Sequence, residues 1–118
     1  MKAFKTCYRS EDFEELRISN KVTLKFFKTR APFESSTEMH LYFNDVYIIL
    51  KGKALVNVSE NFSGGEEQAL GEIRNCHLDT YDVFEVQEGD IFFIPHGTAH
   101  NLIVDSGEFE QIVLKIPK

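Results

Sequence analysis

The sequence of 118 residues lacks the features that mark several large classes of protein. It has no apolar run near the ~20 residues that a transmembrane helix needs, and no apolar stretch of the secretory type follows its first residues. It has no cluster of Lys and Arg, and its formal net charge is -6. Nucleic acids and anionic membranes bind concentrated positive charge. We therefore expect a cytoplasmic protein with neither nucleic-acid nor membrane partners.

Cysteine is scarce and tryptophan is absent. Cys7 and Cys76 have no CxxC spacing, which excludes a zinc knuckle. A reducing compartment also argues against a disulfide, so we expect two free thiols. A chain of this length can bury one hydrophobic core, and we expect residues 1–118 to form one domain.

Helical periodicity is scarce as well, and it suggests only a short turn after Ser10 that includes Phe13, Leu16 and Ile18. Runs of β-branched and aromatic residues dominate instead. The expected strands span residues 22–29, 45–50, 53–58, 84–86, 90–94, 100–105 and 109–116. Many short strands separated by regular turns predict an all-β sandwich or small barrel.

Glycine-containing turns separate these runs. Lys51-Gly52 predicts a tight hairpin between two strands, and further turns are expected at residues 88–90 and 106–108. Residues 59–83 form a longer polar stretch, which fits either a loop that covers a ligand or a solvated hairpin that turns at Gly64-Gly65.

The segment DVYIIL, residues 45–50, is apolar on both faces if it is a strand. Tyr47 and Ile49 would lie on one side, and Val46, Ile48 and Leu50 on the other. A surface strand would alternate apolar with polar residues. We therefore expect one face to meet a second sheet and the other face to meet a second subunit.

Histidines and carboxylates near the strand ends carry the chemical signal. Glu38 and His40 are two residues apart, so they share one face of an extended segment. Asp45 opens a strand, where an unpaired carboxylate is costly to bury. If His100 faces the same interior, the group is a ligand set for Fe, Mn, Ni, Zn or Cu with positions left open for water or substrate.

Two motifs resemble those of the cupin superfamily. In the first, six residues, VYIILK, separate the acidic Asp45 from Gly52. In the second, residues 89–100 read GDIFFIPHGTAH, which has the complete form G-x5-P-x-G-x2-H. The resemblance spans residues 38–104, and the tail from residue 108 resembles the closing strand of small single-domain cupins.

This resemblance implies a double-stranded β-helix, or jelly roll, with residues 36–118 as the barrel core. Residues 1–35 would supply N-terminal strands at the interface of a homodimer. It implies metal ligation by His40, Asp45 and His100, with Glu38 in the place of the usual first histidine. The Pro95/Gly97 turn would aim His100 into the barrel, while His96 would face the rim or solvent.

Three functions follow from these residues. In the first, the barrel is a metal-dependent enzyme of the dioxygenase, isomerase or lyase type, in which Glu38 is a fourth ligand or a general base and Tyr47 shapes the pocket. In the second, it binds a small-molecule ligand without turnover, as a sensor or carrier. In the third, Glu38 and Asp45 only form ion pairs, for which Arg74 and three cations at residues 25–30 are available.

Overall fold

The computed structural model describes residues 3, 5–7, 9, 15–17, 19 and 21–118, and every regular element among them is a β-strand. The strands are β1 (Glu15–Arg17), β2 (Thr23–Arg30), β3 (Phe33–Glu34), β4 (Glu38–His40), β5 (Phe43–Lys51), β6 (Lys53–Ser59), β7 (Phe62–Ala69), β8 (Glu72–Leu78), β9 (Asp82–Gln87), β10 (Ile91–Ile94), β11 (Ala99–Val104) and β12 (Glu108–Pro117). The prediction of an all-β protein is confirmed. Within the described residues, no helix is long and apolar enough to cross a membrane.

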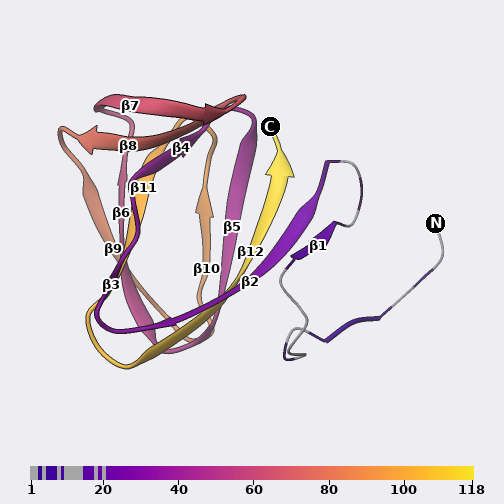
Figure 1. Ribbon diagram of the computed structural model, residues 1–118. Helices are drawn as coiled ribbons and strands as arrows, with labels where there is room; N and C mark the ends of the chain where they lie inside the picture. Colours follow the sequence, from indigo (N-terminus) through magenta and orange to yellow (C-terminus); the bar gives the residue numbers. More distant parts are fainter. Residues whose placement is uncertain (1–2, 4, 8, 10–14, 18, 20) are drawn as a thin grey trace.

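The strands form two antiparallel sheets that face each other as a jelly roll (Figure 1). The five-stranded sheet has the order β1-β2-β12-β5-β10. The seven-stranded sheet has the order β7-β8-β4-β11-β6-β9, with β3 also paired to β11. Between them lies an apolar core that includes Ile49, Val56, Ile94, Val104 and Phe109.

The turn at Lys51-Gly52 does not close a hairpin, so that expectation was wrong. It joins β5 of the five-stranded sheet to β6 of the seven-stranded sheet, and these two strands do not pair. The turns at Gly89 and Gly107 also carry the chain from one sheet to the other. Repeated crossing between two sheets is what makes the barrel a double-stranded β-helix.

Strand β5 is buried on one face, as its sequence predicts. Asp45, Tyr47 and Ile49 are each at most 5% exposed and face the interior. The alternate residues, Val46 and Ile48, are half-buried on the outer face of the sheet. The period of two along the strand therefore places a carboxylate and a phenol in the barrel, in line with the core.

The stretch 59–83 is a hairpin of β7 and β8, but it turns at Leu70-Gly71 rather than at Gly64-Gly65. Gly65 lies within β7, where an added Cβ would meet Cγ2 of Ile73 at 2.8 Å. Gly65 thus permits close packing of β7 against β8, whereas a Cβ at Gly64 would have no neighbour within 4 Å. Because β8 also pairs with β4, the hairpin is joined to the strand that carries Glu38 and His40 (Figure 1).

The N-terminal segment contributes strands to the five-stranded sheet. Strand β2 pairs with β12 over eight positions, from Arg30↔Glu108 to Thr23↔Lys115. Leu16 belongs to β1, which is extended rather than helical. The remainder of the short turn expected after Ser10, at residues 10–14 and 18, lies outside the described residues.

Candidate metal centre

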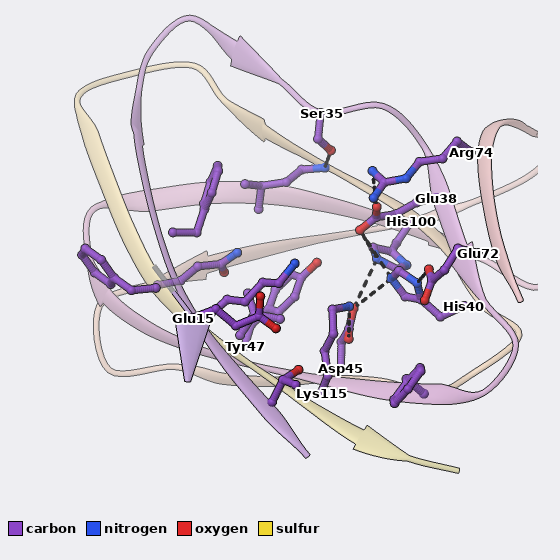
Figure 2. Close-up of a pocket in the computed structure, with 18 of the residues that line it drawn as sticks. Glu15, Ser35, Glu38, His40, Asp45, Tyr47, Glu72, Arg74, His100 and Lys115 are labelled. Atoms are coloured by element: carbon purple, nitrogen blue, oxygen red, sulfur yellow. Dashed lines mark hydrogen bonds and ion pairs between the residues drawn. The ribbon is translucent and has the colours of Figure 1, made fainter. Parts of the chain in front are cut away.

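Four side chains from three strands meet inside the barrel: Glu38 and His40 from β4, Asp45 from β5, and His100 from β11. Glu38 lies directly opposite His100 in the β4–β11 pair, so cross-strand pairing brings these two together. Asp45 reaches the group from the facing sheet. Figure 2 shows the four side chains pointing toward one another.

Four donor atoms surround one point, and each residue supplies one of them. Nε2 of His40 lies 3.2 Å from Oδ2 of Asp45 and 3.4 Å from Oε1 of Glu38. Nε2 of His100 lies 3.4 Å from the same Glu38 oxygen and 3.7 Å from the same Asp45 oxygen. All four atoms lie within 4.8 Å of one another.

Each carboxylate uses its other oxygen to bind a cationic side chain. Oε2 of Glu38 lies 2.6 Å from Nη1 of Arg74, and Oδ1 of Asp45 accepts a hydrogen bond of 3.0 Å from Nζ of Lys115. These contacts fix the orientation of both carboxylates. As a result, one oxygen of each is directed to the point that the histidines face.

Each histidine is likewise held through its Nδ1 atom. Nδ1 of His100 donates to the backbone carbonyl of Thr98 at 3.1 Å, and Nδ1 of His40 contacts Oε2 of Glu72. Both Nε2 atoms are buried and have no hydrogen-bond partner. A hydrogen bond at one ring nitrogen leaves the other free to ligate, which is the usual arrangement of a metal-binding histidine.

The spacing of the four donor atoms fits a single transition-metal ion. Donors about 2.1 Å from a common ion lie roughly 3.0 Å apart at right angles and roughly 3.4 Å apart at tetrahedral angles. The four separations between a histidine nitrogen and a carboxylate oxygen, 3.2 to 3.7 Å, are close to these values, and every pair of donors lies within 4.8 Å. Two imidazoles and two carboxylates also suit Fe, Mn, Ni and Zn. The residues present therefore fit a bound metal, and sequence reasoning named all four.

The charges of the group support this reading. Burial alone would raise the pKa of the Glu38 and Asp45 carboxyls, but the adjacent histidines, and Lys115 beside Asp45, hold both pKa values below their usual range. Burial opposes a charge on His40, yet the carboxylates of Asp45 and Glu38 outweigh it and raise the pKa of His40 to about 10. Without a metal, a proton on His40 compensates the negative charge of the buried carboxylates. A proton and a metal ion therefore compete for Nε2 of His40.

The remaining sequence candidates lie around this group. Tyr47 is 5% exposed, and its ring centroid lies 6.4 Å from that of His100. Burial, and then the charges of Asp45 and Glu38, raise the pKa of Tyr47, so its hydroxyl keeps its proton. His96 is exposed at the rim, as expected, where its backbone N–H donates to Asn44 at 2.8 Å.

Sequence reasoning missed two side chains that hold the donor set. Glu72, from the β7–β8 hairpin, contacts His40, and Lys115, from β12, pairs with Asp45. The alternative in which Glu38 and Asp45 only form ion pairs named Arg74 correctly, because Arg74 pairs with Glu38. The three cations that it named at residues 25–30 pair with neither carboxylate. The sequence offered one signal for such a partner: Lys115 is a charged residue between apolar neighbours in the last strand.

The four donors lie at one end of a cavity of about 550 Å³. Its walls include Phe27, Phe33, Leu102 and Val113, which are apolar. Cavities of this size hold small organic molecules, and apolar walls around a few polar groups are typical of ligand sites. The centre is therefore accessible to a ligand from within the barrel.

Substitution of Glu72 tests whether the contact with His40 supports metal binding. We expect metal affinity to fall in the order wild type, Glu72→Gln, Glu72→Leu, because Gln retains an acceptor for Nδ1 and Leu does not. Loss of such a partner typically lowers metal affinity about 10- to 100-fold. Titration with Zn²⁺ or Mn²⁺ against a competing chelator measures the effect. The exposed Glu85→Leu serves as a control, and an equal affinity for all four proteins would contradict this role.

Comparison with known proteins identifies the fold. Neither a protein-family profile nor a curated protein sequence matches this chain. Among solved structures, BH2720 from Bacillus halodurans is 16% identical with a TM-score of 0.66, over 93% of this chain and 74% of that one. A Klebsiella pneumoniae protein with a double-stranded β-helix domain is 15% identical with a TM-score of 0.59, over 92% of this chain and 82% of that one.

A third similar structure is that of an enzyme. The DMSP lyase DddQ from Ruegeria pomeroyi DSS-3 is 18% identical with a TM-score of 0.58, over 83% of this chain and 39% of that one. Identities this low carry the fold and not the activity. The double-stranded β-helix fold, which the two motifs predicted, is confirmed.

Proposed function

We propose that this chain binds one divalent transition-metal ion through Glu38, His40, Asp45 and His100, and that it acts on a small organic molecule in the adjoining cavity. One observation carries the proposal: two buried Nε2 atoms without hydrogen-bond partners face two carboxylate oxygens across a space that suits one ion. Buried polar atoms in native proteins are seldom left unpaired. A metal ion would satisfy all four atoms at once.

The metal is Fe, Mn, Ni or Zn, and it would supply Lewis acidity or, if it is redox-active, activation of oxygen. Glu38 serves as a ligand rather than as a general base, because His100 and His40 hold the pKa of its carboxyl well below the usual range and so make it a weak proton acceptor. Tyr47 donates a hydrogen bond to the ligand, since its hydroxyl stays protonated. Reactions of the dioxygenase, isomerase or lyase type suit such a site, and a DMSP lyase has the same fold.

A specific observation favours a second candidate, a barrel that binds a small molecule without a metal. The ion pairs Glu38–Arg74 and Asp45–Lys115 partly neutralise the two carboxylates, and a proton on His40 compensates further. The same residues would then form a polar binding pocket. We rank this metal-free candidate second because it leaves Nε2 of His100 without a hydrogen-bond partner.

Elemental analysis of the untagged protein decides between the two. Near-stoichiometric metal supports the first candidate and justifies a screen for oxygenase, isomerase and lyase activity with that metal. Protein that contains no metal after purification, and that fails to bind added Fe²⁺, Mn²⁺, Ni²⁺ or Zn²⁺, would refute the first candidate and leave the second.

We also propose that a second copy of the chain covers the outer face of the five-stranded sheet. Two apolar rows cross this face at directly paired positions: Ile112, Ile48 and Ile91 in one, and Leu114, Val46 and Phe93 in the other. Ile91 is 72% exposed and Phe93 is 56% exposed. The rows contain no charge, so two copies can meet on them without repulsion, and exposed apolar patches commonly mark such contacts.

Sedimentation velocity tests this dimer. We expect the wild type to sediment as a dimer at micromolar concentration, and Phe93→Lys to shift it to monomer, because two buried ammonium groups would face an apolar surface. Val83→Lys is the matched control, since Val83 is 54% exposed but lies on β9 of the other sheet. A monomeric wild type, or a dimer that Phe93→Lys leaves intact, would contradict the proposal.

A further inference from the structure

Gln111 is a buried polar side chain that lines the cavity, and the described residues supply no hydrogen-bond partner for its Oε1 atom. It is 3% exposed, and the cavity is the one that holds the metal centre. Its paired neighbours on β2 and β5 are the apolar Phe27 and Ile49. A purely structural role would favour an apolar residue here, since an unpaired buried amide is destabilising. A hydrogen-bond donor on a bound molecule would therefore supply the partner that Oε1 of Gln111 lacks.

The charges around the cavity indicate the class of that molecule. Among the described residues that line it, five are cationic, namely Arg17, Lys21, Lys25, Arg74 and Lys115. Four are acidic: Glu15 and the three carboxylates around the metal centre. The chain as a whole has 13 basic and 19 acidic residues, so the cavity is enriched in positive charge. A bound divalent cation would increase this excess.

Three of the cations are available to a ligand. Arg74 and Lys115 are paired with Glu38 and Asp45. Arg17, Lys21 and Lys25 form no ion pair with any described residue, and all three are exposed at the β1–β2 side of the cavity. Lysine and arginine in this position favour a carboxylate over a neutral or cationic ligand.

The buried amide restricts the ligand further. An amide oxygen needs a hydrogen-bond donor. An ammonium group would be repelled by the cationic lining, so a hydroxyl group is the donor that fits. The rings of Phe27 and Phe33, whose centroids are 5.5 Å apart, also line the cavity, and they offer an apolar surface to a short carbon chain.

We infer that the ligand of this cavity is a small hydroxy acid, whose carboxylate is bound by the cations of β1, β2 and the connection between them, and whose hydroxyl group is bound by Gln111. The inference rests on the proposed function for the position of the site, but the groups that select the ligand belong to the protein and not to the metal. Gln111 is thus assigned as the residue that distinguishes a hydroxy acid from the corresponding unsubstituted acid.

Four probes of four carbons each test the assignment by thermal unfolding at millimolar concentration: malate, succinate, erythritol and 1,4-diaminobutane. We expect malate to raise the midpoint most and succinate to raise it less, while erythritol and the diamine have no effect. Gln111→Met should abolish the difference between malate and succinate and, without ligand, should raise the midpoint because it removes a buried unpaired amide. Lys25→Gln should weaken both acids equally.

Each other result overturns the inference. No stabilisation by either acid, a larger effect of the diamine, or an unchanged preference for malate in Gln111→Met would show that the ligand or the residue is wrong. The same titrations on Asp45→Ala separate this inference from the proposed function. Suppose that the wild type binds no metal, that the wild type and Asp45→Ala both prefer malate, and that Gln111→Met removes this preference in each. The metal proposal then fails and the ligand assignment stands.

Discussion

Asp45→Ala is expected to abolish stoichiometric metal binding, with a loss of affinity of at least ~100-fold, the upper range for loss of a supporting partner alone. Asp45 is 1% exposed, and its Oδ2 atom lies near the unpaired Nε2 atoms of both histidines. Alanine removes this donor and one of the negative charges that attract a cation. Elemental analysis and chelator competition with Mn²⁺ or Zn²⁺ measure the result.

The control must account for Lys115, which Asp45→Ala leaves without its carboxylate. The Lys115 side chain is 18% exposed, so we expect a loss of about 1 to 3 kcal/mol rather than the full cost of breaking a buried pair. In Asp45→Ala/Lys115→Met the unpaired charge is absent. This double variant should recover stability but not metal. Asp82→Ala, at an exposed position, should bind metal normally.

Two results would contradict the metal centre. Full metal occupancy in Asp45→Ala would show that the ion lies elsewhere. Recovery of metal in the double variant would show that the first loss came from a distorted fold. If the metal is absent from both variants and present in Asp82→Ala, the carboxylate itself is the ligand.

The sequence alone indicated the donor set because its members follow local rules. Glu38 and His40 share a face by the period of two, and Asp45 begins a strand where a carboxylate is unfavourable. The residues that hold the donors could not be found in this way. Lys115 and Glu72 reach Asp45 and His40 through the register of β12 and β8, and register depends on how strands far apart in sequence pair.

The turns show the same limit. A lysine followed by glycine between two apolar runs is compatible with a hairpin and equally with a corner between sheets, because both need a residue that tolerates a positive φ. Gly52 has φ 76° in either case. Which structure forms depends on the partners of β5, and these are β10 and β12 rather than β6. Local residues set the turn, while sheet pairing sets the topology.

Gly52 is nonetheless restricted in a way that most corner glycines are not. A Cβ at this position would lie 2.0 Å from the carbonyl oxygen of Glu108 and 3.3 Å from Cα of Phe109, a fully buried core residue. Gly107 also connects the two sheets and has φ 68°, but a Cβ there would have no neighbour within 4 Å. The pair separates the cost of the backbone conformation from the cost of the close approach.

Gly52→Ala is therefore expected to destabilise the fold far more than Gly107→Ala. The left-handed backbone alone costs about 1 to 2 kcal/mol for alanine, and this applies to both. At Gly52 the backbone of β12 must also move, which adds about 1 to 3 kcal/mol by analogy with overpacked cores. The sum is a large part of the 5 to 15 kcal/mol that typically holds a domain together. Urea unfolding compares the two variants; equal losses would show that the conformation of Gly52, and not its contact with β12, explains the glycine of the first motif.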